Sequence, residues 1–323
     1  MSLTIAGLSL DNPFVLAPLA GYSDLPFRLL CKSLGAGLCV SEMISCHGVV
    51  YQQQKTLSLL KSCAEERPVS FQLFGADPNI MGEAAAILSD WDMDLLDINM
   101  GCPVKKVTRR GAGAALMSNP TKAREIIRQV IKNAKFPVTL KFRAGTDSSN
   151  LNACNFAKMA QDQGVAAITV HGRTWKQAFT GRADWEIIKS VKESVQIPVI
   201  GNGDITSYTE GKTRLSQDFC DGIMIGRGAL GNPWVFDPQG KPDDLSAINK
   251  IARAHIGLFI THITEPHRRI STMKNHLGRY FKGFAGSSSL RKSIYDAKSF
   301  DELFEIFPEP IDELNPPISP NRS

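Results

Sequence analysis

The 323-residue sequence lacks long hydrophobic runs. No apolar stretch approaches the roughly 18 residues that a membrane-spanning helix requires, so we predict no membrane segment. The N-terminal stretch MSLTIAGLSLDNPF has no basic region and contains Asp11 and Asn12, which argues against a secretory signal and for a cytoplasmic protein. Hydrophobic residues make up 43% and charged residues 21% of the chain, which excludes a mainly disordered protein.

The cysteines lack the spacing of a structural framework. Their number, seven, is odd, and no two are arranged as C-x-x-C, which argues against a disulfide scaffold and against a zinc knuckle. We predict no metal site. We interpret all except Cys102 as small buried side chains in a reducing compartment. The other six are Cys31, Cys39, Cys46, Cys63, Cys154 and Cys220.

The glycine pattern G-x-G-x-x-G is absent after the first apolar strand, where residues 17–24 read APLAGYSD. Its absence disfavours an open, doubly wound sheet. Short apolar runs alternate with amphipathic stretches such as 123–132, 155–163 and 185–194, a pattern typical of parallel strands buried on both faces. Eight such units predict an α/β fold, a closed (β/α)8 TIM barrel. The predicted strands are 14–17, 38–41, 69–73, 95–98, 138–142, 167–170, 198–200 and 222–225.

The strand alternation stops near residue 232, where NPWVFDPQGKPDD is typical of a linker. We predict a barrel domain over 1–240, a small helical domain over 241–310, and a disordered, proline-rich tail over 311–323.

Basic charge is concentrated in the predicted helical domain. The whole chain carries +5, but residues 250–298 contain ten basic and two acidic residues, and four of the six histidines. On a helical wheel, Lys274, Arg279 and Lys282 lie opposite an apolar arc of Met273, Leu277, Tyr280, Phe281 and Phe284. This basic face suits an anionic partner, and it equally suits a solvated helix surface.

Polar residues stand at nearly every predicted strand end, where a barrel of this kind carries its active site. The glycine-rich segments GNGD (201–204) and IGRG (225–228) follow the seventh and eighth strands, a common place for a bound phosphate. Cys102 lies between Gly101 and Pro103 after the fourth strand, so it is predicted at the barrel mouth. Lys105, Lys106, Arg109 and Arg110 follow it, and their charge suits a polyanionic substrate.

The combination of motifs resembles the tRNA-dihydrouridine synthases, most closely their bacterial B-type subfamily. The resemblance covers nearly the whole chain, although the link DPQGKPDD is shorter than a typical family link. The motifs that carry it are APLAGYSDLPFR (17–28), SEM (41–43), FQLFG (71–75), DINMGCPVKKV (97–107), VTLKFRAG (138–145), TVHGRT (169–174), PVIGNGDI (198–205), IGRGALGNPWVF (225–236) and MKNHLGRYFKG (273–283).

The resemblance implies an enzyme that uses FMN, with NADPH as electron source, to reduce the 5,6 double bond of a D-loop uridine in tRNA. Hydride would pass to C6 of uracil, and Cys102 would donate a proton to C5. Asn99 would pair with the uracil edge. The residues implied to bind the cofactor are Pro18, Leu19, Ala20, Gln72, Lys141, His171, Asn202, Gly203, Asp204, Gly226 and Arg227.

Several alternatives stay open. Arg143 and Arg173 suit contacts to the substrate nucleotide, and equally a carboxylate such as Asp97. Another FMN-dependent barrel acting on a small molecule such as a pyrimidine would share the phosphate loops and the lysine. An RNA-binding barrel without catalysis would bind no flavin. Nothing in the sequence requires a membrane, an obligate protein partner or more than a monomer, and Glu42 has no assigned role.

Overall fold

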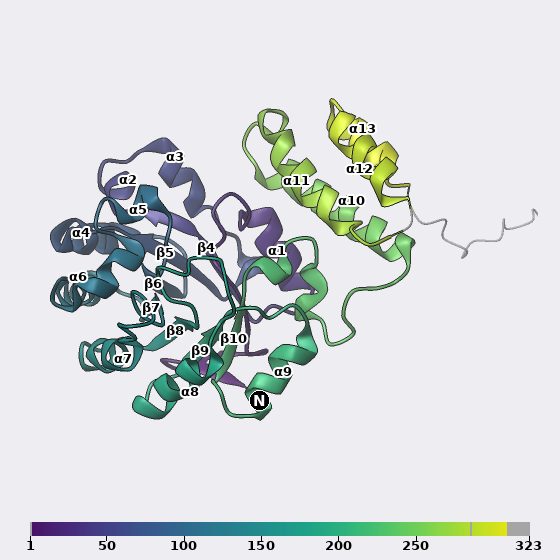
Figure 1. Cartoon of the computed structure of the whole chain (residues 1–323). Coiled ribbons are helices and arrows are strands. Elements are labelled where there is room, and N and C mark those ends of the chain that lie inside the picture. The colour runs from purple at the N-terminus through teal and green to yellow at the C-terminus, as the bar shows by residue number, and fades with distance from the viewer. Residues whose placement is uncertain (1, 285, 309–323) are drawn as a thin grey trace, which may run out of the picture. The chain divides into compact units, whose positions relative to one another are not determined.

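Eight parallel strands close into a barrel with the order β10-β3-β4-β5-β6-β7-β8-β9 (Figure 1). The computed structural model describes residues 2–284 and 286–308. The predicted TIM barrel is confirmed, and each predicted run forms one strand. The strands are β3 (Phe14–Leu16), β4 (Leu38–Ser45), β5 (Val69–Phe74), β6 (Leu95–Met100), β7 (Val138–Arg143), β8 (Ala167–His171), β9 (Val199–Asn202) and β10 (Gly222–Ile225).

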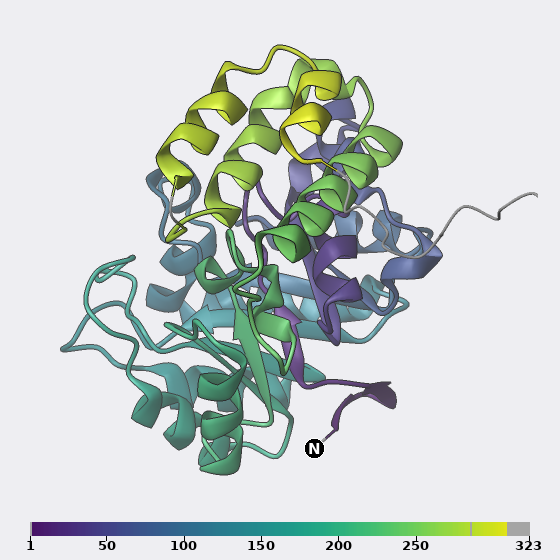
Figure 2. The same ribbon diagram turned by 90° about the vertical axis from the view of Figure 1, so that its right-hand side faces the viewer.

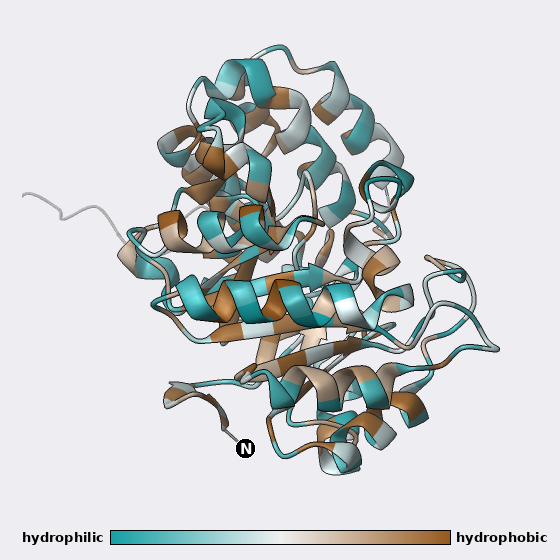
Figure 3. Cartoon of the chain, turned by 90° about the vertical axis from the view of Figure 1, so that its left-hand side faces the viewer, coloured by the Kyte–Doolittle hydropathy of each residue, from teal (hydrophilic) through white to brown (hydrophobic). Residues whose placement is uncertain are grey.

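Amphipathic helices surround the barrel, with apolar and polar stripes visible along them in Figure 3. In α6, Ala123, Ile126, Ile127 and Val130 recur at helical spacing and are buried. The Asn119 side chain caps this helix by accepting from the Lys122 N–H. The outer helices are α1 (Leu25–Ser33), α2 (Cys46–Val50), α3 (Gln54–Leu57), α4 (Pro78–Leu88), α5 (Lys105–Thr108), α6 (Pro120–Asn133), α7 (Ala153–Asp162), α8 (Trp185–Ser194) and α9 (Tyr208–Ser216).

A short N-terminal hairpin, β1 (Leu3–Ile5) and β2 (Leu8–Leu10), was not predicted. Ala6 and Gly7 both have positive φ, 47° and 86°, which is the geometry of a tight two-residue hairpin turn. Buried side chains of both strands, such as Ile5 and Leu10, join a cluster with residues that begin several barrel strands. The hairpin thus contributes to the apolar core at the N-terminal end of the barrel.

The segment predicted as a linker is partly folded, so that prediction was wrong for its first half. Residues Pro233–Phe236 form a 3-10 helix, and Trp234 and Phe236 are buried. Their large apolar side chains outweigh the local proline and aspartate content. The chain divides into two compact units after Lys241, so these residues belong to the barrel unit.

Within its described residues, the second unit contains the α-helices α10 (Leu245–His262), α11 (Ile270–Tyr280), α12 (Ser287–Asp296) and α13 (Phe300–Ile306) (Figure 2). Met273, Leu277 and Tyr280 are fully buried, as their shared helical arc indicates. A hydrogen bond of 2.6 Å joins His255 Nδ1 and Tyr280 Oη between α10 and α11. The predicted tail, 311–323, lies outside the described residues. Among the described helices, none is both long and apolar enough to cross a membrane.

Candidate active site

A cavity of about 590 Å³ opens at the carboxyl ends of the barrel strands. Most of the residues that the strand-end rule singles out line it, so the fold brings them together. The predicted residues in its wall are Pro18, Leu19, Ala20, Asn99, Cys102, Lys141, Arg143, His171, Asn202, Gly203, Asp204, Gly226 and Arg227. Gln72 and Arg173 are not part of this wall.

Cys102 lies in the cavity wall on a loop that is held from two sides. The Asn99 side-chain oxygen accepts hydrogen bonds from the backbone N–H groups of Gly101 (3.2 Å) and Cys102 (3.0 Å). The Ala114 N–H donates to the Cys102 carbonyl over 3.0 Å. Burial raises the pKa of the Cys102 thiol, although Arg143 acts in the opposite direction. The thiol therefore keeps its proton at neutral pH.

Lys141 places a buried cation in the same cavity. Its Nζ donates to Asn202 Oδ1 over 3.0 Å, and the Asn202 amide in turn donates to the Met224 carbonyl over 2.8 Å. Burial, together with Arg143, lowers the pKa of Lys141 to about 8, while Asp97 opposes the shift. Lys141 is therefore charged at neutral pH and loses its proton in mild alkali.

His171 is held as a neutral imidazole. Burial, with the nearby charges of Lys141, Arg143 and other cations, holds the pKa of His171 well below its usual value. Its Nδ1 lies 3.1 Å from the backbone N–H of Arg173 and accepts from it. The proton of the neutral ring therefore belongs on Nε2, which leaves His171 as a hydrogen-bond donor.

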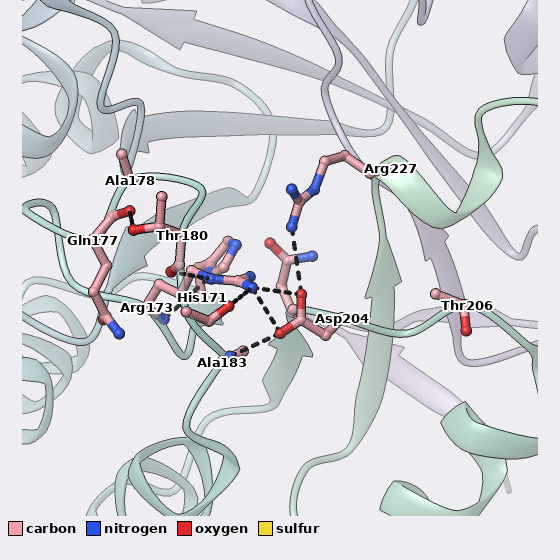
Figure 4. A network of polar contacts seen from close by, with 12 residues as sticks. His171, Arg173, Gln177, Ala178, Thr180, Ala183, Asp204, Thr206 and Arg227 are labelled. Atoms are coloured by element: carbon pink, nitrogen blue, oxygen red, sulfur yellow. Dashed lines mark hydrogen bonds and ion pairs between the residues drawn. The ribbon is translucent and has the colours of Figure 1, made fainter.

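Asp204 joins two arginines at the turn after β9 (Figure 4). Arg173 Nη2 donates to Asp204 over 2.8 Å and to the Gly181 carbonyl over 2.6 Å, and Arg227 Nη2 lies 3.4 Å from Asp204 Oδ1. Partial burial works against ionisation, but the Ala183 N–H and both arginines lower the pKa of Asp204. The carboxylate is thus ionised and orients both guanidinium groups.

Gly203, which precedes Asp204, has a φ of 137°, and a Cβ placed there would lie 2.4 Å from the Ala183 Cβ. Only glycine fits this position without strain. Asp204 itself has a φ of 56°. The GNGD turn is therefore a specifically shaped backbone segment beside Arg227.

The guanidinium of Arg143 contacts backbone carbonyls. It donates to Gly101 (2.6 Å), Thr174 (3.0 Å) and Ala178 (3.0 Å), and so ties the Cys102 loop to the loop after β8. The alternative of a carboxylate partner is confirmed for Arg173, which pairs with Asp204 rather than with Asp97, whereas Asp97 itself bonds to Gln72 and Thr139. A contact between either arginine and the substrate stays a prediction.

A comparison with known proteins identifies the family. The family model "Dihydrouridine synthase (Dus)" matches residues 15–312. The chain is 38% identical over 300 residues to "tRNA-dihydrouridine synthase B" of Pasteurella multocida, covering 90% of each chain. It is 37% identical to "Probable tRNA-dihydrouridine synthase" of Rickettsia bellii, covering 90% of this chain and 92% of the relative. This chain belongs to the dihydrouridine synthase family.

Solved structures with little sequence similarity share the barrel of this dihydrouridine synthase. Histamine dehydrogenase from Rhizobium sp. 4-9 aligns with a TM-score of 0.57 at 13% identity, over 80% of this chain and 50% of that chain. A morphinone reductase variant aligns with a TM-score of 0.54 at 13% identity, over 72% of this chain and 87% of that chain. At this identity the likeness shows the fold alone.

Two contacts of the dihydrouridine synthase were not predicted. The Gly21 N–H donates to the Glu42 carboxylate, so Glu42 holds the loop that contributes Pro18, Leu19 and Ala20 to the cavity. Phe179 lines the cavity and is 56% exposed, with the Arg227 guanidinium 5.9 Å from its ring centre. Neither contact follows a strand-end pattern, since both depend on how loops fold back over the barrel.

The predicted basic residues divide into two groups. Lys105, Lys106 and Arg109 are exposed on and just after α5, close in sequence to the cavity-lining Val104. In the second unit, Arg279 and Lys282 are exposed. Lys274 is half-buried and donates to the carbonyls of Tyr295 and Ala297 at the end of α12. Its ammonium therefore has structural partners within the second unit.

Two further cysteines depart from the sequence interpretation. Four of the six cysteines assigned to the core are buried, but Cys63 and Cys154 are half-exposed. Cys154 lies on α7 to the side of the buried face that Ala153, Phe156 and Ala157 form, and Cys63 lies in the loop just before the 3-10 helix Ala64–Glu66. All seven thiols are free.

Proposed function

We propose that this dihydrouridine synthase uses FMN and NADPH to reduce the 5,6 double bond of a uridine in the D-loop of tRNA. The observation that carries the proposal is a protonated, cavity-facing Cys102 thiol in the same cavity as the buried cation Lys141. The relatives are named for the product, dihydrouridine, and for its carrier, tRNA. We further propose that it acts in the cytoplasm as a monomer.

The cavity fits FMN in charge and shape. Four cations, Lys141, Arg143, Arg173 and Arg227, act together on His171, so the potential there suits an anionic cofactor. Gly203 and Gly226 let the backbone approach a phosphate, and Arg227 can donate to it bidentately.

Apolar residues complete the proposed FMN site. Pro18, Leu19, Ala20 and Met224 supply the kind of wall that a flat ring system requires. The contact between Gln72 and the cofactor stays a prediction, because both amide atoms of the buried Gln72 already have protein partners.

Bound FMN would supply the hydride that adds to C6 of uracil. The residues of the chain then have distinct tasks. Cys102 holds the proton that C5 requires, so hydride and proton together add two hydrogens and leave a thiolate that regains its proton from solvent. Lys141 stabilises negative charge that develops in the poorly hydrated cavity. His171 can donate a hydrogen bond from Nε2 to a bound group. The contact between Asn99 and the uracil edge stays a prediction, because both atoms of the Asn99 amide already have protein partners.

Access to a deep cavity requires that the target base leave its stack. Extrusion costs a few kcal/mol and least in a loop that is already partly unstacked. The exposed basic side chains of Lys105, Lys106 and Arg109 can contact RNA phosphates, as can the exposed basic side chains of the second unit. Such contacts can offset the cost of extruding the nucleobase. Phe179 offers an exposed aromatic face at the cavity on which a base can stack.

The decisive experiment is mass spectrometry of a tRNA that lacks dihydrouridine, after incubation with the purified protein, FMN and NADPH. We expect a gain of two hydrogens on a D-loop uridine. A yellow protein that oxidises NADPH but leaves the tRNA unchanged would contradict the tRNA assignment and favour a small-molecule substrate such as a pyrimidine. A colourless protein that binds tRNA would instead favour an RNA-binding role.

A further inference from the structure

Three polar residues lie side by side inside the barrel, one on each of three neighbouring strands. Gln72 on β5 is paired in register with Asp97 on β6, and Asp97 is paired with Thr139 on β7. All three side chains are more than nine-tenths buried. A buried carboxylate in a barrel interior is costly unless its oxygens accept hydrogen bonds, so the arrangement calls for an explanation.

Both Asp97 oxygens have donors. Thr139 Oγ1 donates to Asp97 Oδ1 over 2.6 Å, and Gln72 Nε2 donates to Asp97 Oδ2 over 2.7 Å. Gln72 Oε1 then accepts from Asn99 Nδ2 over 2.6 Å. Asn99 Oδ1 accepts from the backbone N–H of Cys102 over 3.0 Å. A continuous chain of hydrogen bonds thus runs from the Asp97 carboxylate to the loop that carries Cys102.

The carboxylate decides the direction of every bond in this chain. An ionised carboxylate only accepts, so Gln72 must turn its Nε2 toward Asp97 and its Oε1 toward Asn99. Asn99 must then turn its Nδ2 toward Gln72, which leaves Oδ1 for the loop N–H groups. If either amide were reversed, two acceptors or two donors would face each other in a buried site.

We propose that Asp97 is a positioning residue that acts through Gln72 and Asn99 to hold the Cys102 loop in the geometry for proton donation. The proposal rests on the proposed function for its catalytic consequence, but its structural core, the orientation of the loop, does not. It also assigns Gln72 a place behind the cavity wall, where its amide transmits the orientation that the carboxylate sets.

Two variants break the chain at different bonds. Asp97→Ala removes the acceptor, and Gln72→Met removes both amide atoms while keeping a similar volume. Asp97→Ala leaves the Gln72 amide free to reverse, and Gln72→Met leaves Asn99 Nδ2 with only its contact to the Met43 sulfur. In both variants the Asn99 amide can therefore turn and release the Cys102 loop. We expect each variant to slow single-turnover reduction of tRNA by about tenfold to a hundredfold, since small misplacements of a reacting group have costs of that size. The affinity for tRNA should change little.

A second readout reports on the loop without any reaction of the cofactor. The rate at which iodoacetamide alkylates Cys102 is measured peptide by peptide with mass spectrometry. We expect this rate to rise several-fold in both variants, while the rate at half-exposed Cys154 on α7 stays constant as an internal reference. The double variant Asp97→Ala/Gln72→Met should resemble either single variant, because both break one chain.

The conservative variant Asp97→Asn separates hydrogen bonding from charge. The introduced amide can keep its oxygen toward Gln72 and donate its NH₂ group to Thr139, whose hydroxyl accepts as well as donates. We therefore expect alkylation of Cys102 and single-turnover rates close to those of the unchanged protein, although the negative charge near Lys141 is lost.

Three outcomes would overturn the proposal: unchanged Cys102 alkylation in folded Asp97→Ala and Gln72→Met, additive losses in the double variant, or equal damage from Asp97→Asn and Asp97→Ala. If Asp97→Ala fails to fold by circular dichroism, Gln72→Met still decides the question. An unchanged protein that does not reduce tRNA would refute the proposed function, and the alkylation rates would still test the positioning role.

Discussion

Cys102 is the residue on which the proposed chemistry depends most. Its thiol is protonated because burial raises its pKa, so it can act as a general acid at neutral pH. Replacing it by alanine should lower the rate of tRNA reduction by about a hundredfold or more, as loss of a general acid does. The bound flavin and its reduction by NADPH should persist, which absorbance at the flavin band measures.

The matched control for Cys102→Ala is Cys154→Ala, which removes another half-exposed thiol, on α7. We expect this variant to keep normal turnover. Full activity in Cys102→Ala would show that another group donates the proton. Equal loss in both variants would show that the effect is not specific to the site.

From the lowered pKa of Lys141 we expect the affinity for the cofactor to depend on pH. The pKa of Lys141 is lowered to about 8 by burial and by Arg143, so the cation disappears as the pH rises through that value. If the cation attracts FMN, affinity of the apoprotein should fall above pH 8, by at most about tenfold per pH unit for one proton. Titration of FMN into apoprotein by fluorescence, from pH 7 to 9, measures this fall.

Three of the groups near Lys141 do not titrate in the same interval. His171 is already neutral, Asp204 is ionised, and the raised pKa of Cys102 keeps its thiol protonated. Lys141→Met should therefore bind FMN more weakly and with an affinity that is flat between pH 7 and 9. An affinity that rises through pH 8, or the same slope in Lys141→Met, would disprove the assignment.

Among single residues, the sequence predicted the positions of the site better than their contacts. Cys102, Lys141 and His171 could be placed because strand ends converge at one end of a barrel. The chain from Asp97 to Asn99 could not, because it depends on the register between neighbouring strands. Likewise, the contact of Glu42 with Gly21 depends on a loop closing over the barrel.

At the scale of elements, the eight barrel strands were predictable because parallel strands buried on both faces form continuous apolar runs. The hairpin β1–β2 was missed because three-residue strands carry too little pattern. The 3-10 helix Pro233–Phe236 was hidden by its proline-rich surroundings, although its large apolar side chains are buried. The composition of this segment is typical of a linker, but its large apolar side chains are buried because they pack against other parts of the protein.

The glycines of the helical unit give a prediction about stability. Gly257 lies within α10 and has open space where a Cβ would stand. Gly257→Ala should therefore raise the free energy of unfolding of this unit by about 0.5–1 kcal/mol, because alanine loses less backbone entropy in a helix. Urea unfolding followed by hydrogen exchange in α10–α13 measures the change.

Gly278 in α11 serves as the contrasting position. A Cβ there would lie 3.0 Å from Tyr295 Oη, closer than ordinary contact, so the Tyr295 side chain must shift. Gly278→Ala should gain less stability than Gly257→Ala or lose some. A larger gain at Gly278 than at Gly257 would contradict the packing described for α11 and α12.

At the scale of the whole molecule, positive charge is concentrated in one part of the chain. Residues 250–298 are strongly basic, whereas the rest of the chain is slightly acidic. Within this segment, Arg279 and Lys282 are exposed, whereas Lys274 donates to carbonyls of α12. Reversal of Lys274 would also remove these two hydrogen bonds, so the test of the basic surface uses Arg279 and Lys282, whose side chains are exposed.

The double variant Arg279→Glu/Lys282→Glu should bind tRNA about tenfold more weakly or worse, and each lost phosphate contact should flatten the dependence of log affinity on log salt by about 1. Oxidation of NADPH by the flavin should persist, because the cavity lies within the barrel unit.

The matched control, Arg124→Glu/Lys158→Glu, makes the same change in net charge at exposed positions on α6 and α7. Equal weakening in both variants would mean that net charge alone draws the RNA to the protein. Unchanged affinity in the first would place the RNA on another surface, with Lys105, Lys106 and Arg109 beside the cavity as the next residues to reverse.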